Sequence, residues 1–189
     1  MITIRITKMV NAPMDRCFRL ARSIDLQCAA RGPAVASIEG STSGLIGAGD
    51  SISWQHRPSL KTMVDVFRPP SYYREVMVEG DYMSYEHEHH FAPFNDGTRI
   101  REEIRVTPSN GLFGRIAMWL YLRKRLTRQV EQHIAMLKRV AESEEWHVYL
   151  DGKPDFDVCP QPVPQSISKT AALTGQSSLA EQHRRQQTG

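Results

Sequence analysis

The sequence has no long hydrophobic run and few cysteines. Its longest apolar stretch, Ile116 to Leu122, is far too short to cross a bilayer. The N-terminus alternates apolar and polar residues, unlike the apolar stretch of a signal peptide. The 3 cysteines among 189 residues are few and odd in number, which favours free thiols in a reducing compartment over a disulfide framework. We therefore expect a soluble, cytoplasmic protein.

No strong excess of either charge is present overall, since 24 Lys and Arg against 21 Asp and Glu leave a net charge of +3. The excess is local, because residues 111–143 hold 7 basic and 2 acidic side chains. Aromatic residues are not interleaved with these charges, which argues against a nucleic-acid partner. With 40% hydrophobic residues, the chain is able to bury a real core.

Several sequence motifs for cofactors and catalysis are missing. The sequence has no GxGxxG, GK[ST], GxSxG, CxxC or HExxH pattern, and its glycine-rich stretch near residues 40–49 lacks a strand–helix context for phosphate binding. We therefore predict no cofactor and no metal.

The order of predicted elements is one strand, one or two helices, six strands and a long helix. Alternation of Ile2, Ile4 and Ile6 predicts the first strand, and Pro13 is placed to begin the first helix. The six sequential strands have tight turns and no helix between them, which indicates an antiparallel meander. They are predicted near residues 36–39, 50–57, 62–67, 72–79, 82–91 and 98–107.

The long helix is predicted from about Gly111 to Ser143, capped by Ser109 or Asn110. Its apolar residues fall on one side at 100° per residue. Beyond Asp151 the composition becomes rich in Pro, Gln and Ser. We predict one domain over residues 1–146 and a disordered tail over residues 147–189.

The alternation of two strands predicts polar side chains in the interior. Glu86 and Glu88 belong in solvent, so His87 and His89 point inward with their neighbours Tyr85 and Phe91. On the next strand the same argument turns Glu102 inward with three aliphatic residues. On the long helix, Arg123 falls within the apolar stripe.

Three stretches together resemble the START/SRPBCC superfamily, and most closely its bacterial, polyketide cyclase/dehydrase-like ligand-binding proteins. They are VNAPMDRCF (Val10–Phe18), FRPPSYYREVMVEGDYMSYEHEHHF (Phe67–Phe91) and DGTRIREEIRVTP (Asp96–Pro108). The sequence departs from the family pattern at Arg74, where the subgroup tends to have an acidic residue, and at Glu102, where it has Asp.

The resemblance implies an α+β helix-grip fold, in which a curved antiparallel sheet of about seven strands wraps around the long C-terminal helix. It also implies an internal cavity between sheet and helix that binds a small hydrophobic ligand, lipid-like or polyketide-like. The side chains that we predict to line it are Trp54, Tyr85, His87, His89, Phe91, Glu102, Trp119 and Arg123.

Other interpretations of the same residues remain open. Glu102 and Arg123 would form a buried ion pair with a purely structural role, in which case Arg123→Ala costs about 3 kcal/mol. His87, His89 and Glu102 would instead serve as acid–base groups of a cyclase or dehydratase. His87-x-His89 is only a weak metal signal, because no further ligand has matching spacing.

The basic face of the long helix has two interpretations. Such a face is usually just solvated. Alternatively, it would contact an anionic membrane or an acidic partner weakly through Arg115, Lys124, Arg125 and Arg128. The oligomeric state does not follow from the sequence.

Overall fold

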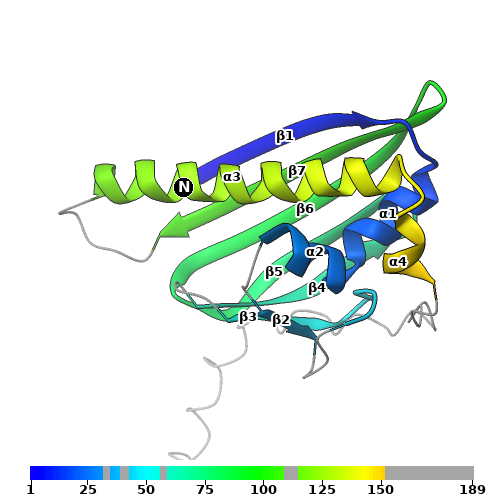
Figure 1. Cartoon of the computed structure of the whole chain (residues 1–189). Coiled ribbons are helices and arrows are strands. Elements are labelled where there is room, and N and C mark those ends of the chain that lie inside the picture. The colour runs from blue at the N-terminus through cyan, green and yellow to red at the C-terminus, as the bar shows by residue number, and fades with distance from the viewer. Residues whose placement is uncertain (32–34, 39–42, 56–58, 109–114, 152–189) are drawn as a thin grey trace, which may run out of the picture.

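A computed structural model of the protein describes residues 1–31, 35–38, 43–55, 59–108 and 115–151, and the side chains of residues 35–38, 55 and 115–118 lie outside the description. The helices and strands follow the predicted order along the chain (Figure 1). They are β1 (Ile2–Val10), α1 (Met14–Arg22), α2 (Ile24–Arg31), β2 (Val35–Ile38), β3 (Ser51–Gln55), β4 (Leu60–Arg68), β5 (Tyr72–Gly80), β6 (Tyr82–Phe94), β7 (Gly97–Pro108), α3 (Arg115–Ala141) and α4 (Trp146–Leu150).

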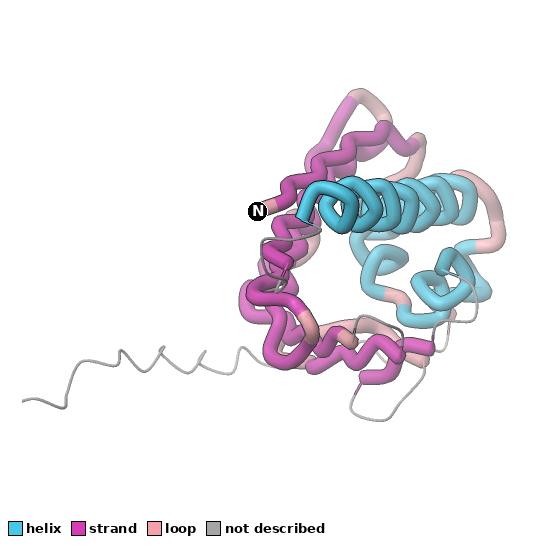
Figure 2. Tube along the Cα trace, turned by 90° about the vertical axis from the view of Figure 1, so that its left-hand side faces the viewer, coloured by secondary structure: helices cyan, strands magenta, loops and turns pink. Residues whose placement is uncertain are grey.

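The strands form one antiparallel sheet of seven strands in the order β1-β7-β6-β5-β4-β3-β2. Sequential strands from β2 to β7 are therefore neighbours, which confirms the predicted meander, and β1 pairs with β7 at the edge. Figure 2 shows the sheet curving around the helices, with α3 lying across its concave side. The predicted α+β helix-grip fold is thus confirmed.

Helix α3 buries one apolar stripe against the sheet. The buried side chains recur every three or four residues, as an amphipathic helix requires, and they are Leu122, Leu126, Val130, Ile134, Leu137, Val140 and Ala141. The predicted cap at Ser109 or Asn110 lies outside the described residues. Within the described part of the chain, no helix combines the length and apolar character needed to span a membrane.

Helices α1 and α2 close one end of the concave face. The ring of Phe18 on α1 packs at 5.7 Å from Phe67, 5.9 Å from Tyr73 and 5.4 Å from Phe91, measured between ring centroids. Cys17 is fully buried beside it. These contacts join α1 to β4, β5 and β6.

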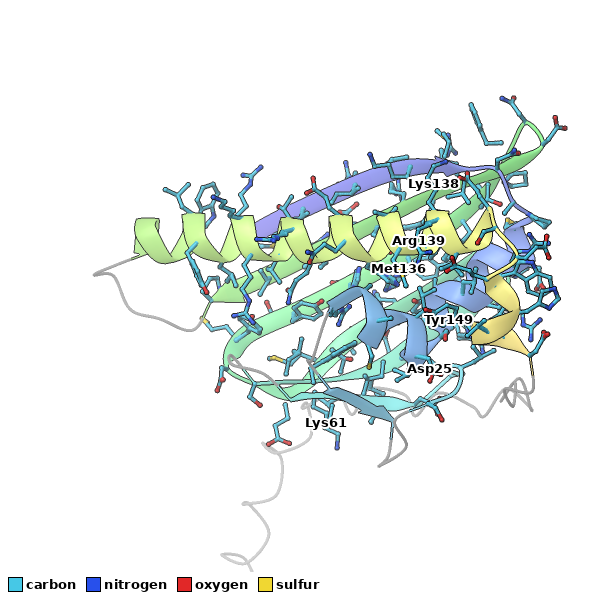
Figure 3. The ribbon with its side chains drawn as sticks, in the orientation of Figure 1. Asp25, Lys61, Met136, Lys138, Arg139 and Tyr149 are labelled. Atoms are coloured by element: carbon cyan, nitrogen blue, oxygen red, sulfur yellow. The ribbon has the colours of Figure 1, made fainter. Side chains whose placement is uncertain are left out.

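Helix α4 extends the folded part beyond the predicted domain boundary at residue 146. The Arg16 guanidinium of α1 lies 4.5 Å from the centre of the Trp146 ring, and Leu150 is 3% exposed. Figure 3 shows Arg139 on α3 and Tyr149 on α4 at the same end of the molecule. The predicted disorder beyond Asp151 concerns residues outside the described ranges and stays a prediction.

The convex face of the sheet carries a network of charged side chains. Glu103 points to this face, yet it is buried because Arg5 and Arg105 cover it, each with a nitrogen 2.7 Å from a Glu103 oxygen. Arg74 forms a bidentate ion pair with the carboxylate of Asp65. The unusual basic residue at position 74 therefore has an acidic partner on the neighbouring strand, away from the interior.

Candidate functional site

The interior of the sheet carries a cluster of histidines and carboxylates where β5, β6 and β7 face α3. The predicted alternation is confirmed, because Tyr85, His87, His89 and Phe91 are all buried. Strand pairing sets His89 directly opposite Glu102. The predicted inward direction of Glu102 is also confirmed, since this carboxylate is 1% exposed.

Glu102 is the centre of the cluster. Its Oε2 lies 3.1 Å from His87 Nε2, and its Oε1 lies 3.1 Å from His133 Nδ1 and 3.7 Å from His89 Nδ1. Burial alone would raise the pKa of this carboxyl group, but the charge of His133 and hydrogen bonds from the imidazoles outweigh burial and hold the pKa well below its ordinary value. Glu102 is therefore an anion inside the protein.

Glu75 is a second buried carboxylate in the same cluster. Its Oε2 accepts a hydrogen bond of 2.9 Å from the Thr62 hydroxyl, and its Oε1 lies 3.6 Å from His89 Nε2. Burial opposes ionisation, but His89 and then His87 lower the pKa of Glu75 to about 2. Two ionised carboxylates thus share the interior.

The imidazoles of His87 and His89 lie 3.9 Å apart between ring centroids, and the Tyr73 ring stacks on His89 at 4.1 Å. Burial and then repulsion from His89 lower the pKa of His87 to about 4. Burial also disfavours protonation of His89, but the carboxylates of Glu102 and Glu75 prevail and raise its pKa. The two neighbouring imidazoles therefore differ in their affinity for a proton.

The predicted ion pair between Glu102 and Arg123 is wrong. Arg123 is exposed, and its guanidinium lies 5.2 Å from the centre of the Trp119 ring. The partner that α3 supplies to Glu102 is His133, which is 1% exposed. Arg123 has the correct helical phase but sits on the first half of α3, which extends past α2 in Figure 1.

The sequence interpretation missed three members of the cluster, and two of them left a signal. His133 lies three residues after Val130 and four before Leu137, so it belongs to the buried stripe of α3. Glu75 lies opposite His87, and both are six residues from Asp81 at the turn between β5 and β6. Thr62 left none, because register shifts interrupt the pairing of β4 with β5.

A small pocket leads to this cluster between α3 and the sheet. Its volume is about 20 Å³, which is room for one water molecule. Apolar and aromatic side chains share its lining with the buried cluster and with further polar side chains. The lining side chains are Arg31, Trp54, Leu60, Tyr82, Tyr85, His87, Glu102, Ile104, Arg125, Leu126, Gln129, Val130 and His133.

Of the eight predicted ligand-binding residues, four line this pocket: Trp54, Tyr85, His87 and Glu102. The other four lie elsewhere. His89 is buried behind the pocket against Tyr73, and Phe91 packs in the core against Phe18. Trp119 is half-buried beside the exposed Arg123.

Two of the residues predicted for membrane contact, Lys124 and Arg128, are exposed on α3, whereas Arg125 is half-buried at the pocket. The side chain of Arg115 lies outside the described residues. Contact with an anionic membrane stays a prediction, which flotation with vesicles containing or lacking anionic lipid would test.

Comparison with known proteins gives similarity in structure alone. No family model and no curated protein matches the sequence. The protein TTHA0849 from Thermus thermophilus is similar with a TM-score of 0.58 and 19% identity, over 73% of this chain and 95% of that one. The Aha1 dimer from Colwellia psychrerythraea has a TM-score of 0.53 and 13% identity, over 75% and 97% of the two chains.

A third similar structure is the di-domain ARO/CYC StfQ from the steffimycin biosynthetic pathway. Its TM-score is 0.61 with 13% identity, over 76% of this chain and 51% of StfQ, so this chain spans about half of that protein. These similarities, at 13–19% identity, concern the fold alone, and they agree with the helix-grip fold that the resemblance of the three sequence stretches implies. The chain therefore has a helix-grip fold.

Proposed function

We propose that the protein binds a small hydrophobic ligand, lipid-like or polyketide-like, in the pocket between the sheet and α3. The observation that carries this proposal is an unsatisfied polar atom on a residue that lines the pocket. His133 lines it, and its Nε2 is buried with no hydrogen-bond partner among the described residues. A buried polar atom without a partner costs about 1–3 kcal/mol, which a ligand hydroxyl or carbonyl would recover.

The walls of the pocket suit an apolar ligand body. Trp54 and Tyr85 on the sheet face Leu126 and Val130 on α3 across this space. Pockets for small ligands combine such walls with a few polar groups that fix orientation. Glu102 and His133 would recognise a ligand that carries one polar group on an apolar skeleton.

Entry of a ligand requires side chains at the rim to move. The guanidinium of Arg31, at the end of α2, lies 3.7 Å from the centre of the Trp54 ring. A pocket of about 20 Å³ is far below the roughly 300 Å³ of typical ligand sites. We propose that Arg31 swings away from Trp54 as the ligand enters, so that binding widens the pocket.

Native mass spectrometry of the purified protein, followed by solvent extraction, would identify a bound ligand. Binding of the dye ANS supplies a second readout. We expect Leu126→Phe, which fills the pocket, to weaken ANS binding at least about tenfold, whereas Leu120→Phe on the exposed side of α3 leaves it unchanged. Equal binding by the two variants would contradict the proposal, provided that both melt cooperatively.

A second candidate function is acid–base catalysis of the cyclase or dehydratase kind, and the contact between Glu102 and His133 favours it. A carboxylate on one ring nitrogen orients an imidazole whose other nitrogen faces a substrate, as in general-base catalysis. His133 has the first part of this arrangement, with Nδ1 toward Glu102, and it lines the pocket with its Nε2 unpaired among the described residues. StfQ, a similar structure, is an ARO/CYC from a biosynthetic pathway.

This candidate is tested with a linear poly-ketone thioester as substrate and mass spectrometry of the products. His133→Gln should abolish cyclisation while ANS still binds. Unchanged cyclisation by this variant would exclude His133 as the base, and no cyclisation by the unmodified protein would leave ligand binding as the better proposal.

We also propose a cytoplasmic location, and one domain whose predicted boundary at residue 146 moves to residue 151 so that it includes α4, followed by a disordered tail. The location is supported by the free thiols of Cys17 and Cys28. Fractionation of the native cells would test it, and limited proteolysis would test the tail, since a disordered segment is cleaved first.

A further inference from the structure

We propose that Glu75, His87 and His89 bind a divalent transition-metal ion, with Zn²⁺ as the ion that best suits these ligands. One potential ligand atom from each of the three side chains lies within 4.8 Å of the others, and all three residues are buried. This inference goes beyond the proposed function, because neither ligand binding nor acid–base chemistry requires a metal.

The donor set is one that zinc accepts. Two imidazoles and one carboxylate are among the ligand sets of zinc sites that keep a fourth position for water or substrate. His87 and His89 alternate on one strand and Glu75 comes from its neighbour, where pairing puts it directly opposite His87. Three ligands on two rigid strands form a preorganised site.

The surroundings of His89 are independent support for a bound metal ion. Neither of its ring nitrogens has a hydrogen-bond partner among the described residues, although the side chain is 1% exposed. Its nearest carboxylate oxygens, at 3.6 Å in Glu75 and 3.7 Å in Glu102, are too far for good hydrogen bonds. A metal ion would satisfy one nitrogen, and a small approach of a carboxylate would satisfy the other.

Residues around the three ligands are those that a metal site needs. Metal-binding imidazoles commonly donate their second N–H to a carboxylate, which fixes the ring. Glu102 is placed to accept from His87 at 3.1 Å, which leaves the other ring nitrogen of His87 for the metal. The Thr62 hydroxyl similarly holds one oxygen of Glu75 and leaves the other for the metal.

Charge balance also favours a dication. Glu75 and Glu102 bring two carboxylate groups into the interior, where they are 3% and 1% exposed. In the part of the chain that the structure describes, their ion-pair partners are histidines, with no lysine or arginine nitrogen within 4.0 Å. A divalent ion would neutralise both carboxylates and would leave the imidazoles neutral, as metal ligands must be.

The test is a titration of the full chain, stripped of metal with a chelator, with Zn²⁺ against a competing chromogenic chelator. We expect one ion per chain. His89→Gln and Glu75→Gln should weaken binding more than about 100-fold, and Glu102→Gln, which removes an outer carboxylate, about 10- to 100-fold.

Two variants are the matched controls. His90→Gln changes the neighbouring histidine of β6, which contacts Glu88 rather than the cluster. His147→Gln removes the exposed histidine that lies near Glu144 and Asp151. Both should bind Zn²⁺ like the unmodified chain. Loss of binding in His147→Gln alone, or equal binding by His89→Gln and the unmodified chain, would overturn the proposal.

A measurement on the unmodified chain covers the case in which a cluster variant does not fold. Long-range ¹H–¹⁵N spectra of ¹⁵N-histidine protein should show metal binding at one nitrogen in each of two buried imidazoles. If no imidazole nitrogen shifts at one equivalent of Zn²⁺, the cluster is a structural ion network only. ANS binding with and without Zn²⁺ then shows separately whether the proposed ligand pocket stands.

Discussion

At the scale of single residues, the interior anion of Glu102 depends on imidazoles from two different elements. His87 comes from β6 and His133 from α3, so the carboxylate connects the sheet to the helix. A charge in the interior is tolerated only when partners replace the water that it has lost. Removal of a partner of the Glu102 carboxylate should therefore lower the free energy of unfolding, whereas removal of an exposed cation should not.

This contrast predicts opposite outcomes for two substitutions on the same helix. His133→Ala should lower the free energy of unfolding by about 3 kcal/mol, because it leaves Glu102 with fewer partners and opens a cavity. Arg123→Ala should change it by less than about 0.5 kcal/mol, because Arg123 is exposed. Chemical denaturation measures both. A larger loss of unfolding free energy in Arg123→Ala would indicate that Arg123 lies in the interior, as the helical phase predicts.

The thiols provide a second prediction. Cys17 is buried, and burial raises its pKa to about 11, so little thiolate is present near neutral pH. Cys28 is partly exposed. We expect iodoacetamide at pH 8 to modify Cys28 at least about tenfold faster than Cys17, and to reach Cys17 readily only in denaturant. Peptide mass mapping measures the rates, and equal rates in the folded protein would contradict the burial of Cys17.

At the scale of elements, the two faces of β7 hold charge in different ways. Glu102 faces the helix and is neutralised by histidines, whereas its neighbour Glu103 faces outward and is neutralised by Arg5 and Arg105. Hydrogen bonding from Arg5 outweighs partial burial and, with help from Arg105, lowers the pKa of Glu103 to about 2. The outer network thus joins β1 to β7 only while Glu103 is ionised.

Glu103 should therefore contribute stability that depends on pH. Its folded pKa of about 2 lies below the ordinary 4.5, so the contribution is complete above the ordinary pKa and is lost as the pH falls toward 2. In Glu103→Gln the free energy of unfolding should fall less steeply between pH 5 and roughly pH 2. Glu79→Gln, which changes an exposed carboxylate on β5, should keep the original slope. If the unfolding free energy of Glu103→Gln fell with pH as steeply as that of the unmodified chain, the proposed role of the Glu103 network would be contradicted.

The elements also explain which parts of the site were predictable. Alternation found the inward faces of β6 and β7, because a shift by one residue would have buried Glu86 and Glu88. Helical phase alone gave a wrong prediction for Arg123. The phase gives the direction of a side chain around the helix axis, but it does not say whether another element packs against that turn of the helix. The contact of His133 with Glu102 depends on the position of α3 along the sheet, and no local sequence pattern determines that position.

At the scale of the whole molecule, the fold persists at sequence identities as low as 13%. Alternation, turns and one amphipathic helix specify this architecture, and many different sequences supply them. The polar cluster is not required by that pattern, because apolar residues at the same positions would satisfy it. Its chemistry therefore belongs to this chain and not to the fold in general.

Helix α4 leads to a prediction about the extent of the domain. Leu150 is 3% exposed, so a chain that ends at residue 146 loses a buried side chain which a chain ending at residue 151 retains. We expect the shorter chain to be less stable by about 2 kcal/mol. Thermal melts of the two truncated chains measure the difference. Equal melting temperatures would place the domain boundary at residue 146, as the sequence predicted.

The contact of Arg31 with Trp54 also makes tryptophan fluorescence a probe of the pocket. The Arg31 guanidinium lies 3.7 Å from the centre of the Trp54 ring, so the emission of Trp54 depends on whether that contact is present. Of the other two tryptophans, Trp146 lies beside α1 and Trp119 beside Arg123, so neither lines the pocket. In a chain with Trp119 and Trp146 replaced by Phe, the remaining tryptophan fluorescence comes from Trp54. Its change after stopped-flow mixing with a ligand therefore measures the rate at which Arg31 moves away from Trp54.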